Sequence, residues 1–172
     1  MHPQLTLVLG GARSGKSAYA EALLADAAEA VYLATAEPGD QEMAERIRLH
    51  QRRRGAAWTT VEEPLDLTGA LAAHCRAGRP LLVDCLTLWL SNVLLAGGDA
   101  GAAIDRLAAS LPDLPGPLVM VANEVGLGIV PGNALARAFR DHAGRLNQRV
   151  AAAAQHVVFI AAGLPLVLKD LA

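Results

Sequence analysis

The stretch Gly10-Gly11-Ala12-Arg13-Ser14-Gly15-Lys16-Ser17 decides the fold. It matches the pattern G-x-x-x-x-G-K-[ST], in which glycines let backbone N–H groups turn inward on a phosphate. An apolar run at residues 5–9 precedes it and suits one buried strand, and good helix formers follow over residues 16–27. This order argues against a chance glycine-rich turn. It predicts a phosphate site in which Lys16 reaches the outer phosphates and Ser17 ligates Mg²⁺.

The composition is that of a globular chain. The 172 residues suffice for one domain with a real core, and 53% of them are hydrophobic, which argues against disorder. A net charge of −2 and 3% aromatic residues disfavour nucleic-acid and membrane-surface partners. No apolar run reaches the length of a membrane span, and residues 1–4 do not form a signal peptide. We therefore expect a single domain over residues 1–172, with no nucleic-acid partner and no membrane span.

The two cysteines, Cys75 and Cys85, are few and far apart in the sequence. That spacing suits neither a disulfide framework nor a zinc site. We interpret them as reduced core thiols of a cytoplasmic protein.

Strand-like runs alternate with helical ones along the chain, which indicates an α/β fold with a mostly parallel sheet. A last apolar run, residues 165–169, follows Gly163 and is expected to return as an antiparallel edge strand. The expected strands lie at residues 5–9, 30–35, 58–62, 80–85, 117–122 and 156–161. The expected helices lie at residues 16–27, 41–53, 65–77, 86–95, 102–111 and 133–154, with N-caps at Asp40 and Asn133.

Residues that end the parallel strands are the first candidates for a site, because ligands bind beyond the carboxyl ends of such strands. Asp84 closes an apolar strand, as does the Walker-B carboxylate that holds Mg²⁺ opposite the loop hydroxyl. The alternative is that Asp84 caps the helix beginning near Leu86. We favour the metal role because the phosphate loop requires a Mg²⁺ partner. Asn123 and Glu124 end another strand.

The stretch from Glu42 to Arg54 is a second candidate. Met43, Ile47 and His50 share one helix face by their spacing, and Arg52, Arg53 and Arg54 follow closely. An imidazole beside guanidinium groups is placed to meet a polyphosphate, and nearby cations favour its neutral, nucleophilic form. Taken alone, a core or capping histidine and a solvated arginine-rich helix end are the simpler interpretation.

Two later stretches also carry chemistry. The glycines of residues 123–131 indicate backbone that lies close to a ligand, and the absence of a following Lys-x-Asp excludes a Ras-like protein. Arg140, Asp141, Arg145 and Asn147 fall on the last long helix. Spacing alone does not choose between a pocket and a subunit contact for them.

Together these stretches resemble the bifunctional adenosylcobinamide kinase/adenosylcobinamide-phosphate guanylyltransferases of cobalamin biosynthesis. The resemblance runs from residue 5 through nearly the whole chain. GGARSGKS at 10–17, NEVGLGIVP at 123–131 and FRDHAGRLNQ at 139–148 carry it most specifically. Further matching pieces are Tyr32-Leu33-Ala34-Thr35-Ala36, residues 42–47, His50 and Trp58.

The resemblance implies a RecA-like P-loop fold, a homotrimer and two reactions at one nucleotide site. In the first reaction, ATP or GTP phosphorylates adenosylcobinamide. In the second, GTP transfers GMP to an enzyme histidine and then to adenosylcobinamide phosphate, which gives adenosylcobinamide-GDP.

The family's functional residues fall on matching positions of this chain. The nucleotidylated histidine falls on His50, which reverses the simpler interpretation of that residue, so His50 and Lys16 are the expected catalytic residues. The expected metal ligands are Ser17 and Asp84. The expected nucleotide contacts are Gly10, Gly11, Ala12, Arg13, Ser14, Gly15, Lys16, Ser17, Ala34, Thr35, Ala36, Gln51, Arg52, Arg53, Arg54, Glu62 and Asp84.

Two positions depart from the pattern of the family, and two other functions are also compatible with the sequence. Some members carry two adjacent histidines where this chain has Leu49-His50, and some carry Glu in place of Asp84. One rival is a monofunctional P-loop kinase of a small hydroxyl substrate, in which His50 is structural. The other is a RecA-like nucleotide-switched binding module, whose basic nucleic-acid stripe the net charge of −2 does not support.

Overall fold

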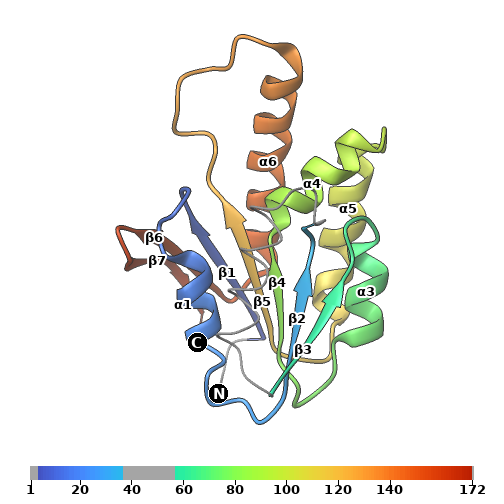
Figure 1. Ribbon diagram of the computed structural model, residues 1–172, viewed down its shortest axis with the longest axis vertical. Helices are drawn as coiled ribbons and strands as arrows, with labels where there is room; N and C mark the ends of the chain where they lie inside the picture. Colours follow the sequence, from blue (N-terminus) through green and yellow to red (C-terminus); the bar gives the residue numbers. More distant parts are fainter. Residues whose placement is uncertain (1–3, 37–56, 172) are drawn as a thin grey trace.

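The computed structural model describes residues 4–36 and 57–171. Within these residues the fold is built on a seven-stranded sheet of order β3-β2-β4-β5-β1-β6-β7 (Figure 1). All neighbours from β3 to β6 pair in parallel, and β7 pairs antiparallel with β6. The predicted mostly parallel α/β sheet with an antiparallel edge strand is therefore confirmed.

The strands are β1 (Leu5–Gly10), β2 (Ala30–Ala34), β3 (Trp58–Glu62), β4 (Leu81–Asp84), β5 (Leu118–Asn123), β6 (His156–Ala161) and β7 (Leu164–Asp170). The helices are α1 (Lys16–Ala22), α3 (Leu67–His74), α4 (Leu86–Leu95), α5 (Ala100–Ser110) and α6 (Ala134–Ala153), with a short 3₁₀ turn η1 (Leu111–Asp113) after α5. Each predicted strand is present to within one residue at either end.

The helices agree less closely with prediction. α4 has the predicted bounds, and Asn133 caps α6, since its side chain accepts a hydrogen bond from the Ala136 N–H at 2.7 Å. The helix predicted over residues 16–27 ends at Ala22, because the next residues form tighter turns such as Leu24 N–H to Glu21 O. The predicted helix 41–53 and its cap Asp40 lie outside the described residues.

Two further helix starts were misplaced because their caps were not recognised. α3 begins two residues later than predicted, because the Asp66 side chain accepts from the Gly69 N–H at 3.0 Å. α5 begins two residues earlier, because Asp99 accepts from the Ala102 N–H at 3.0 Å. In each case an Asp side chain satisfies a free N–H of the first helical turn.

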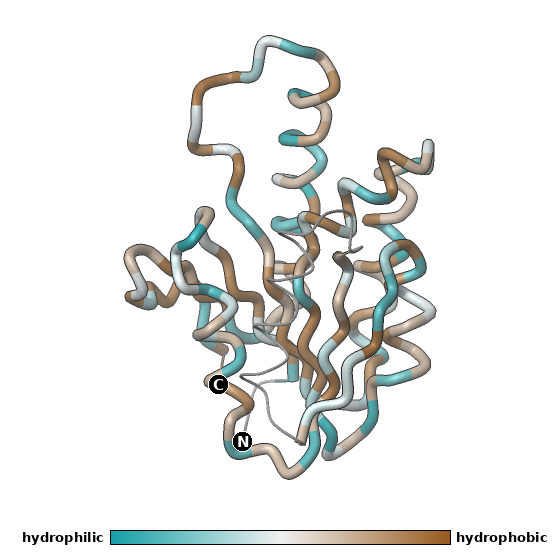
Figure 2. The backbone as a smooth tube through the Cα atoms, in the orientation of Figure 1, coloured by the Kyte–Doolittle hydropathy of each residue, from teal (hydrophilic) through white to brown (hydrophobic). Residues whose placement is uncertain are grey.

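The two faces of the sheet are covered unequally. Alternate strand residues such as Leu7, Leu33 and Val83 pack with α3, α4, α5 and α6 in one large cluster. The residues between them, such as Val8 and Leu82, pack with α1 in a smaller cluster. Figure 2 shows the apolar stretches concentrated in the strands of the sheet. In the part of the chain that the structure describes, no helix is long and apolar enough to cross a membrane.

The carboxyl ends of the parallel strands meet at one edge of the sheet (Figure 1). Gly10 at the end of β1 pairs with Asn123 at the end of β5, and Asp84 of β4 pairs with Val121. The phosphate loop, Asp84 and Asn123 therefore all lie at the carboxyl ends of the strands, as expected for a ligand site of this fold class.

Candidate nucleotide site

The phosphate loop connects the end of β1 to the start of α1. Arg13 and Gly15 both adopt positive φ, at 55° and 97°, so the backbone curls around a concave centre. A Cβ on Gly10 would lie 2.5 Å from Ser14 Oγ and 2.7 Å from Ile160 O, so this position accepts only glycine without displacement. The loop thus has the tight turn and the approach of backbone N–H groups that an anion requires.

Lys16 folds back over this loop. Its side chain is 8% exposed, and Nζ donates a hydrogen bond to Gly11 O at 3.0 Å. An ammonium has three donors, so this bond leaves capacity for phosphate oxygens. A lysine so nearly buried is unusual unless an anion pairs with it, and the loop therefore fits a phosphate.

Neighbouring elements hold the loop from both sides. The Gly163 N–H, in the turn between β6 and β7, donates to Ser14 O at 2.8 Å. The Glu124 N–H, directly after β5, donates to Gly10 O at 3.0 Å. Both bonds go to loop carbonyls, so neither uses a loop N–H group, although the Ser14 N–H donates to Gly11 O at 3.3 Å within the loop.

Ser17 and Asp84 belong to elements that meet on the α1 face of the sheet. Ala20 lies one helical turn after Ser17, and it packs against the sheet in the same cluster as Leu82. Asp84 follows Leu82 by two residues on β4, so its side chain points to that same face of the sheet. A hydroxyl and a carboxylate on one face of the sheet suit a Mg²⁺ ion that also binds phosphates.

Asp84 does not cap α4, so that alternative is wrong. Cys85 is the N-cap residue, and it makes no side-chain capping bond. The Asp84 carboxylate instead accepts a hydrogen bond from the Tyr32 hydroxyl, with 2.6 Å between the hydroxyl oxygen and Oδ2. An ionised carboxylate has about four acceptor positions, so one bond leaves room for a cation.

The end of β2, which carries the expected nucleotide contacts Ala34, Thr35 and Ala36, lies beside Asp84. Ala34 is buried against α1, Ala36 is half-buried, and Thr35 is 0% exposed. The Thr35 hydroxyl donates to Cys85 O at 2.7 Å and accepts from the Cys85 N–H at 2.9 Å. Its side chain therefore holds the end of β4 and does not face solvent.

Glu62 is not brought to the loop. It is exposed at the end of β3, the edge strand, whereas the phosphate loop follows β1 four strands away. At about 4.8 Å between strands, the separation across the sheet is roughly 19 Å. The expected site residues His50, Gln51, Arg52, Arg53 and Arg54 lie outside the described residues.

Asn123 is a candidate that the sequence marked only as a strand end. Its Oδ1 and the Ser14 Oγ are buried without a hydrogen-bond partner among the described residues. Spacing alone did not choose between a pocket and a subunit contact for Asn147. In the structure Asn147 is buried, and its side chain donates a hydrogen bond to Asn123 O at 3.3 Å. Two unpaired buried oxygens at the loop edge suit a bound ligand or ordered water. The feature of the sequence that could have identified Asn123 is a polar residue at the end of a buried strand.

Cys85 and Cys75 are both buried and free, as expected for core thiols. Burial raises the pKa of the Cys85 thiol, and the negative charge of Asp84 raises it further. Burial likewise raises the pKa of Cys75. Cys85 therefore stays a neutral thiol next to the candidate metal ligand.

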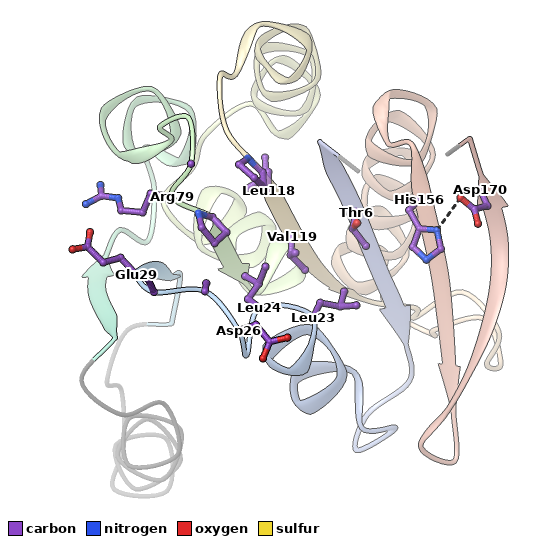
Figure 3. A pocket seen from close by; sticks show the side chains of 15 residues that line it. Thr6, Leu23, Leu24, Asp26, Glu29, Arg79, Leu118, Val119, His156 and Asp170 are labelled. Carbon is purple, nitrogen blue, oxygen red and sulfur yellow. Dashed lines mark ion pairs between the residues drawn. The ribbon is translucent and has the colours of Figure 1, made fainter. Parts of the chain in front are cut away.

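A cavity of about 800 Å³ lies at the amino ends of the parallel strands, opposite to the phosphate loop (Figure 3). Thr6, Pro80, Val119 and His156 line it at the amino ends of their strands, and Leu24 closes it from the chain after α1. His156 Nδ1 lies 3.6 Å from Asp170 Oδ1 at its rim. The cavity is thus separate from the phosphate loop and is not part of the candidate nucleotide site.

Comparison with known proteins decides the family. The model of the CobU family, described as cobinamide kinase / cobinamide phosphate guanyltransferase, matches residues 6–168. The chain belongs to this family.

Three relatives align with nearly the whole chain. The bifunctional adenosylcobalamin biosynthesis protein CobP of Pseudomonas aeruginosa is 51% identical over 166 residues, which cover 95% of this chain and 96% of that protein. The bifunctional adenosylcobalamin biosynthesis protein CobU of Salmonella typhimurium is 43% identical over 96% of this chain and 99% of that protein. The protein of the same name from Escherichia coli is 41% identical with the same coverage.

The fold of this family member is that of P-loop NTPases. An ATPase from the type III secretion system of pathogenic bacteria superimposes with a TM-score of 0.57 at 14% identity, over 98% of this chain and 57% of that one. The predicted P-loop fold class is therefore confirmed.

Proposed function

We propose that this chain is a bifunctional enzyme of cobalamin biosynthesis, which phosphorylates adenosylcobinamide and then transfers GMP to the product. The observation that carries the proposal is the family match over residues 6–168, in a chain whose phosphate loop is fully formed. Relatives over 40% identical across almost their whole length are named bifunctional adenosylcobalamin biosynthesis proteins.

The first step is phosphoryl transfer from ATP or GTP. The hydroxyl oxygen of adenosylcobinamide attacks the γ-phosphorus, the bond to the β–γ bridging oxygen breaks, and the hydroxyl proton is released. The loop N–H groups and Lys16 hold the phosphates in line, which supplies most of what this reaction needs. Ser17 and Asp84 would hold Mg²⁺, which neutralises charge on the phosphates when bound.

The second step is guanylyl transfer through His50. An imidazole nitrogen attacks the α-phosphorus of GTP, the bond to pyrophosphate breaks, and GMP becomes attached by a P–N bond. A phosphate oxygen of adenosylcobinamide phosphate then attacks the same phosphorus, which releases His50 and gives adenosylcobinamide-GDP. By family resemblance, Arg52, Arg53 and Arg54 stabilise the departing pyrophosphate, and Gln51 and Glu62 contact the guanine nucleotide.

We also propose a cytoplasmic homotrimer of single-domain subunits, with the corrinoid at the subunit boundary. Leu127 and Ile129, 83% and 98% exposed, lie on the segment between β5 and α6 that projects beyond the carboxyl edge of the sheet (Figure 1). Leu164 and Leu166 of β7 are exposed at the far end of the sheet. Two separate apolar surfaces suit a closed ring, in which each surface meets a different neighbour. If light scattering at the assay concentration shows a monomer and that monomer is fully active, the trimer is contradicted.

Product analysis with labelled GTP tests the two activities. GTP labelled at the α-phosphate should release pyrophosphate and label the protein without any acceptor, and γ-labelled GTP should label adenosylcobinamide. A monofunctional kinase would pass the γ-label to the acceptor but release no pyrophosphate. Filter binding to single-stranded DNA should be negative, whereas a nucleotide-switched nucleic-acid module would be retained.

A further inference from the structure

Tyr32 contacts Asp84 across two neighbouring strands. In the parallel pair β2–β4, Tyr32 lies opposite Leu82, so Asp84 is its diagonal neighbour on the same face of the sheet. A tyrosine side chain is long enough to span that diagonal. The hydroxyl oxygen lies 2.6 Å from Asp84 Oδ2, a short bond typical of a phenol donating to a carboxylate.

The phenol is held in a single orientation. Tyr32 is 5% exposed, and its ring meets the ring of Trp58 edge-on, with centroids 6.4 Å apart and planes at 72°. Ala34 and Leu82 belong to the same apolar cluster. A hydrogen bond shielded in this way is stronger than one in water.

The backbone of Asp84 is fixed at the same time from β2. The Thr35 N–H donates to Asp84 O at 3.1 Å, and the Thr35 hydroxyl binds both backbone groups of Cys85. With the main chain held by Thr35 and Oδ2 held by Tyr32, the Asp84 carboxylate has little freedom to rotate.

We propose that Tyr32 is a positioning residue for the divalent cation. It occupies Oδ2, fixes the rotation of the carboxylate and leaves Oδ1 for the metal. The inference rests on the proposed role of Asp84 as a Mg²⁺ ligand, and nothing in the phosphate-loop motif assigns a function to Tyr32. Partners that orient a metal-binding carboxylate usually change metal affinity when they are removed.

The test measures cation binding directly. Mn²⁺ is titrated into the full chain with a non-hydrolysable GTP analogue, and free Mn²⁺ is followed by electron paramagnetic resonance. Tyr32→Phe should weaken Mn²⁺ binding about ten-fold. It should leave binding of the analogue in EDTA unchanged, because the proposed role of Tyr32 acts through the metal ligand Asp84. In turnover assays the half-saturating Mg²⁺ concentration should rise, while kcat at saturating Mg²⁺ recovers.

Tyr19→Phe is the matched control. Tyr19 is the chain's other tyrosine, and it packs in the same apolar cluster as Tyr32. The Tyr19→Phe variant should bind Mn²⁺ with the same affinity as the wild type. Thermal melting followed by circular dichroism gives the folded fraction, to which each Mn²⁺ affinity is referred. A Tyr32→Phe affinity within about two-fold of the Tyr19→Phe value would overturn the inference.

Asp84→Asn separates this inference from the proposed metal site. If Asp84→Asn weakens Mn²⁺ binding and Tyr32→Phe does not, the role of Tyr32 alone fails. If Asp84→Asn has no effect, the metal role of Asp84 fails, and the inference fails with it. In the Asp84→Asn background, Tyr32→Phe should change the affinity less than about two-fold, because it acts through Asp84.

Discussion

The side chain of Thr35 closes a two-bond clamp on the backbone of Cys85. Its hydroxyl donates to Cys85 O at 2.7 Å and accepts from the Cys85 N–H at 2.9 Å. All these groups are buried, so the clamp replaces hydrogen bonds to water at the point where β4 ends. It lies on the face of the sheet opposite to that of the Asp84 carboxylate, so it fixes the strand end without blocking the site.

Removing this hydroxyl should destabilise the fold. Thr35→Val removes the partner of the buried Cys85 N–H, whereas Cys85 O still accepts from the Trp89 N–H at 3.1 Å. The free energy of unfolding should fall by about 1–3 kcal/mol. Thr35→Ser keeps the hydroxyl and should lose much less. Urea unfolding followed by circular dichroism measures both. A loss in Thr35→Val no larger than that in Thr35→Ser would contradict a dominant role for the hydroxyl clamp.

Lys16 should be required for nucleotide binding but not for folding. Lys16→Ala removes an ammonium aimed at phosphates, and GTP affinity by calorimetry should fall roughly 100-fold with an unchanged melting temperature. The matched control is Lys169→Ala, since the chain has one other lysine. Lys169 Nζ binds the carbonyls of Ala151 and Ala152 at the end of α6, so that variant should lose a little stability and no GTP affinity. Unchanged GTP binding by Lys16→Ala would refute the phosphate-loop assignment.

Gly10 should tolerate no side chain. In Gly10→Ala the new methyl group meets Ser14 Oγ and the backbone oxygen of Ile160, so the loop must shift. Stability should fall by about 1–3 kcal/mol, and GTP binding should weaken as well. Gly144→Ala is the control, because beyond its chain neighbours and the backbone of its own helix no atom lies within 4 Å of its Cβ position on α6. That change should raise stability by about 0.5–1 kcal/mol, and a Gly10→Ala protein as stable as wild type would contradict the account.

His50 should carry GMP as a P–N adduct. With α-³²P-GTP and Mg²⁺, the label should survive alkali and be lost in acid, as for a phosphoramidate and unlike a serine ester. His50→Ala should abolish labelling and guanylyl transfer but keep phosphorylation of adenosylcobinamide, because the phosphate loop is intact. His74→Ala, at the end of α3, should label normally. Retained labelling in His50→Ala, or joint loss of both activities in a folded protein, would refute this role.

Cys85 should make the fold less stable in alkali. Burial and the charge of Asp84 raise the thiol pKa above its ordinary value of 9.0, so the folded state keeps a proton that the unfolded chain releases. Stability is therefore unaffected below about pH 9 and falls as pH rises toward the folded-state pKa. Compared with Cys85→Ala, the wild type should lose up to about 1.4 kcal/mol more per pH unit in that range. Equal slopes in urea unfolding between about pH 8 and 11 would contradict the assignment.

The strands were predictable because each is a short apolar run bounded by turn residues. Ala162 and Gly163, both at positive φ, form the turn that reverses the chain. This reversal is what the prediction of an antiparallel strand over residues 165–169 required. The end of α1 was not predictable, because Leu23 and Leu24 favour helix locally but pack against the sheet from a turn. Likewise, Asp66 and Asp99 cap helices, although their neighbours gave no clear boundary.

Within the site, the phosphate loop was predictable from its motif, but its surroundings were not. The contact between Tyr32 and Asp84 depends on β2 lying beside β4, a pairing between strands about fifty residues apart, which local patterns do not encode. For the same reason, family resemblance alone could not show that Glu62 lies on the edge strand.

The hydrogen bond from Gly163 to Ser14 also bears on the order of synthesis. The phosphate loop leaves the ribosome before all the later strands, yet β1 lies between β5 and β6, and Ser14 is held by the turn that follows β6. A nascent chain that ends before residue 156 contains the entire phosphate-binding motif but lacks one neighbour of β1 and the bond to Ser14. Nucleotide can therefore stabilise this fold only late in translation, and ribosome-bound fragments should gain protection by GTP only once Gly163 has emerged.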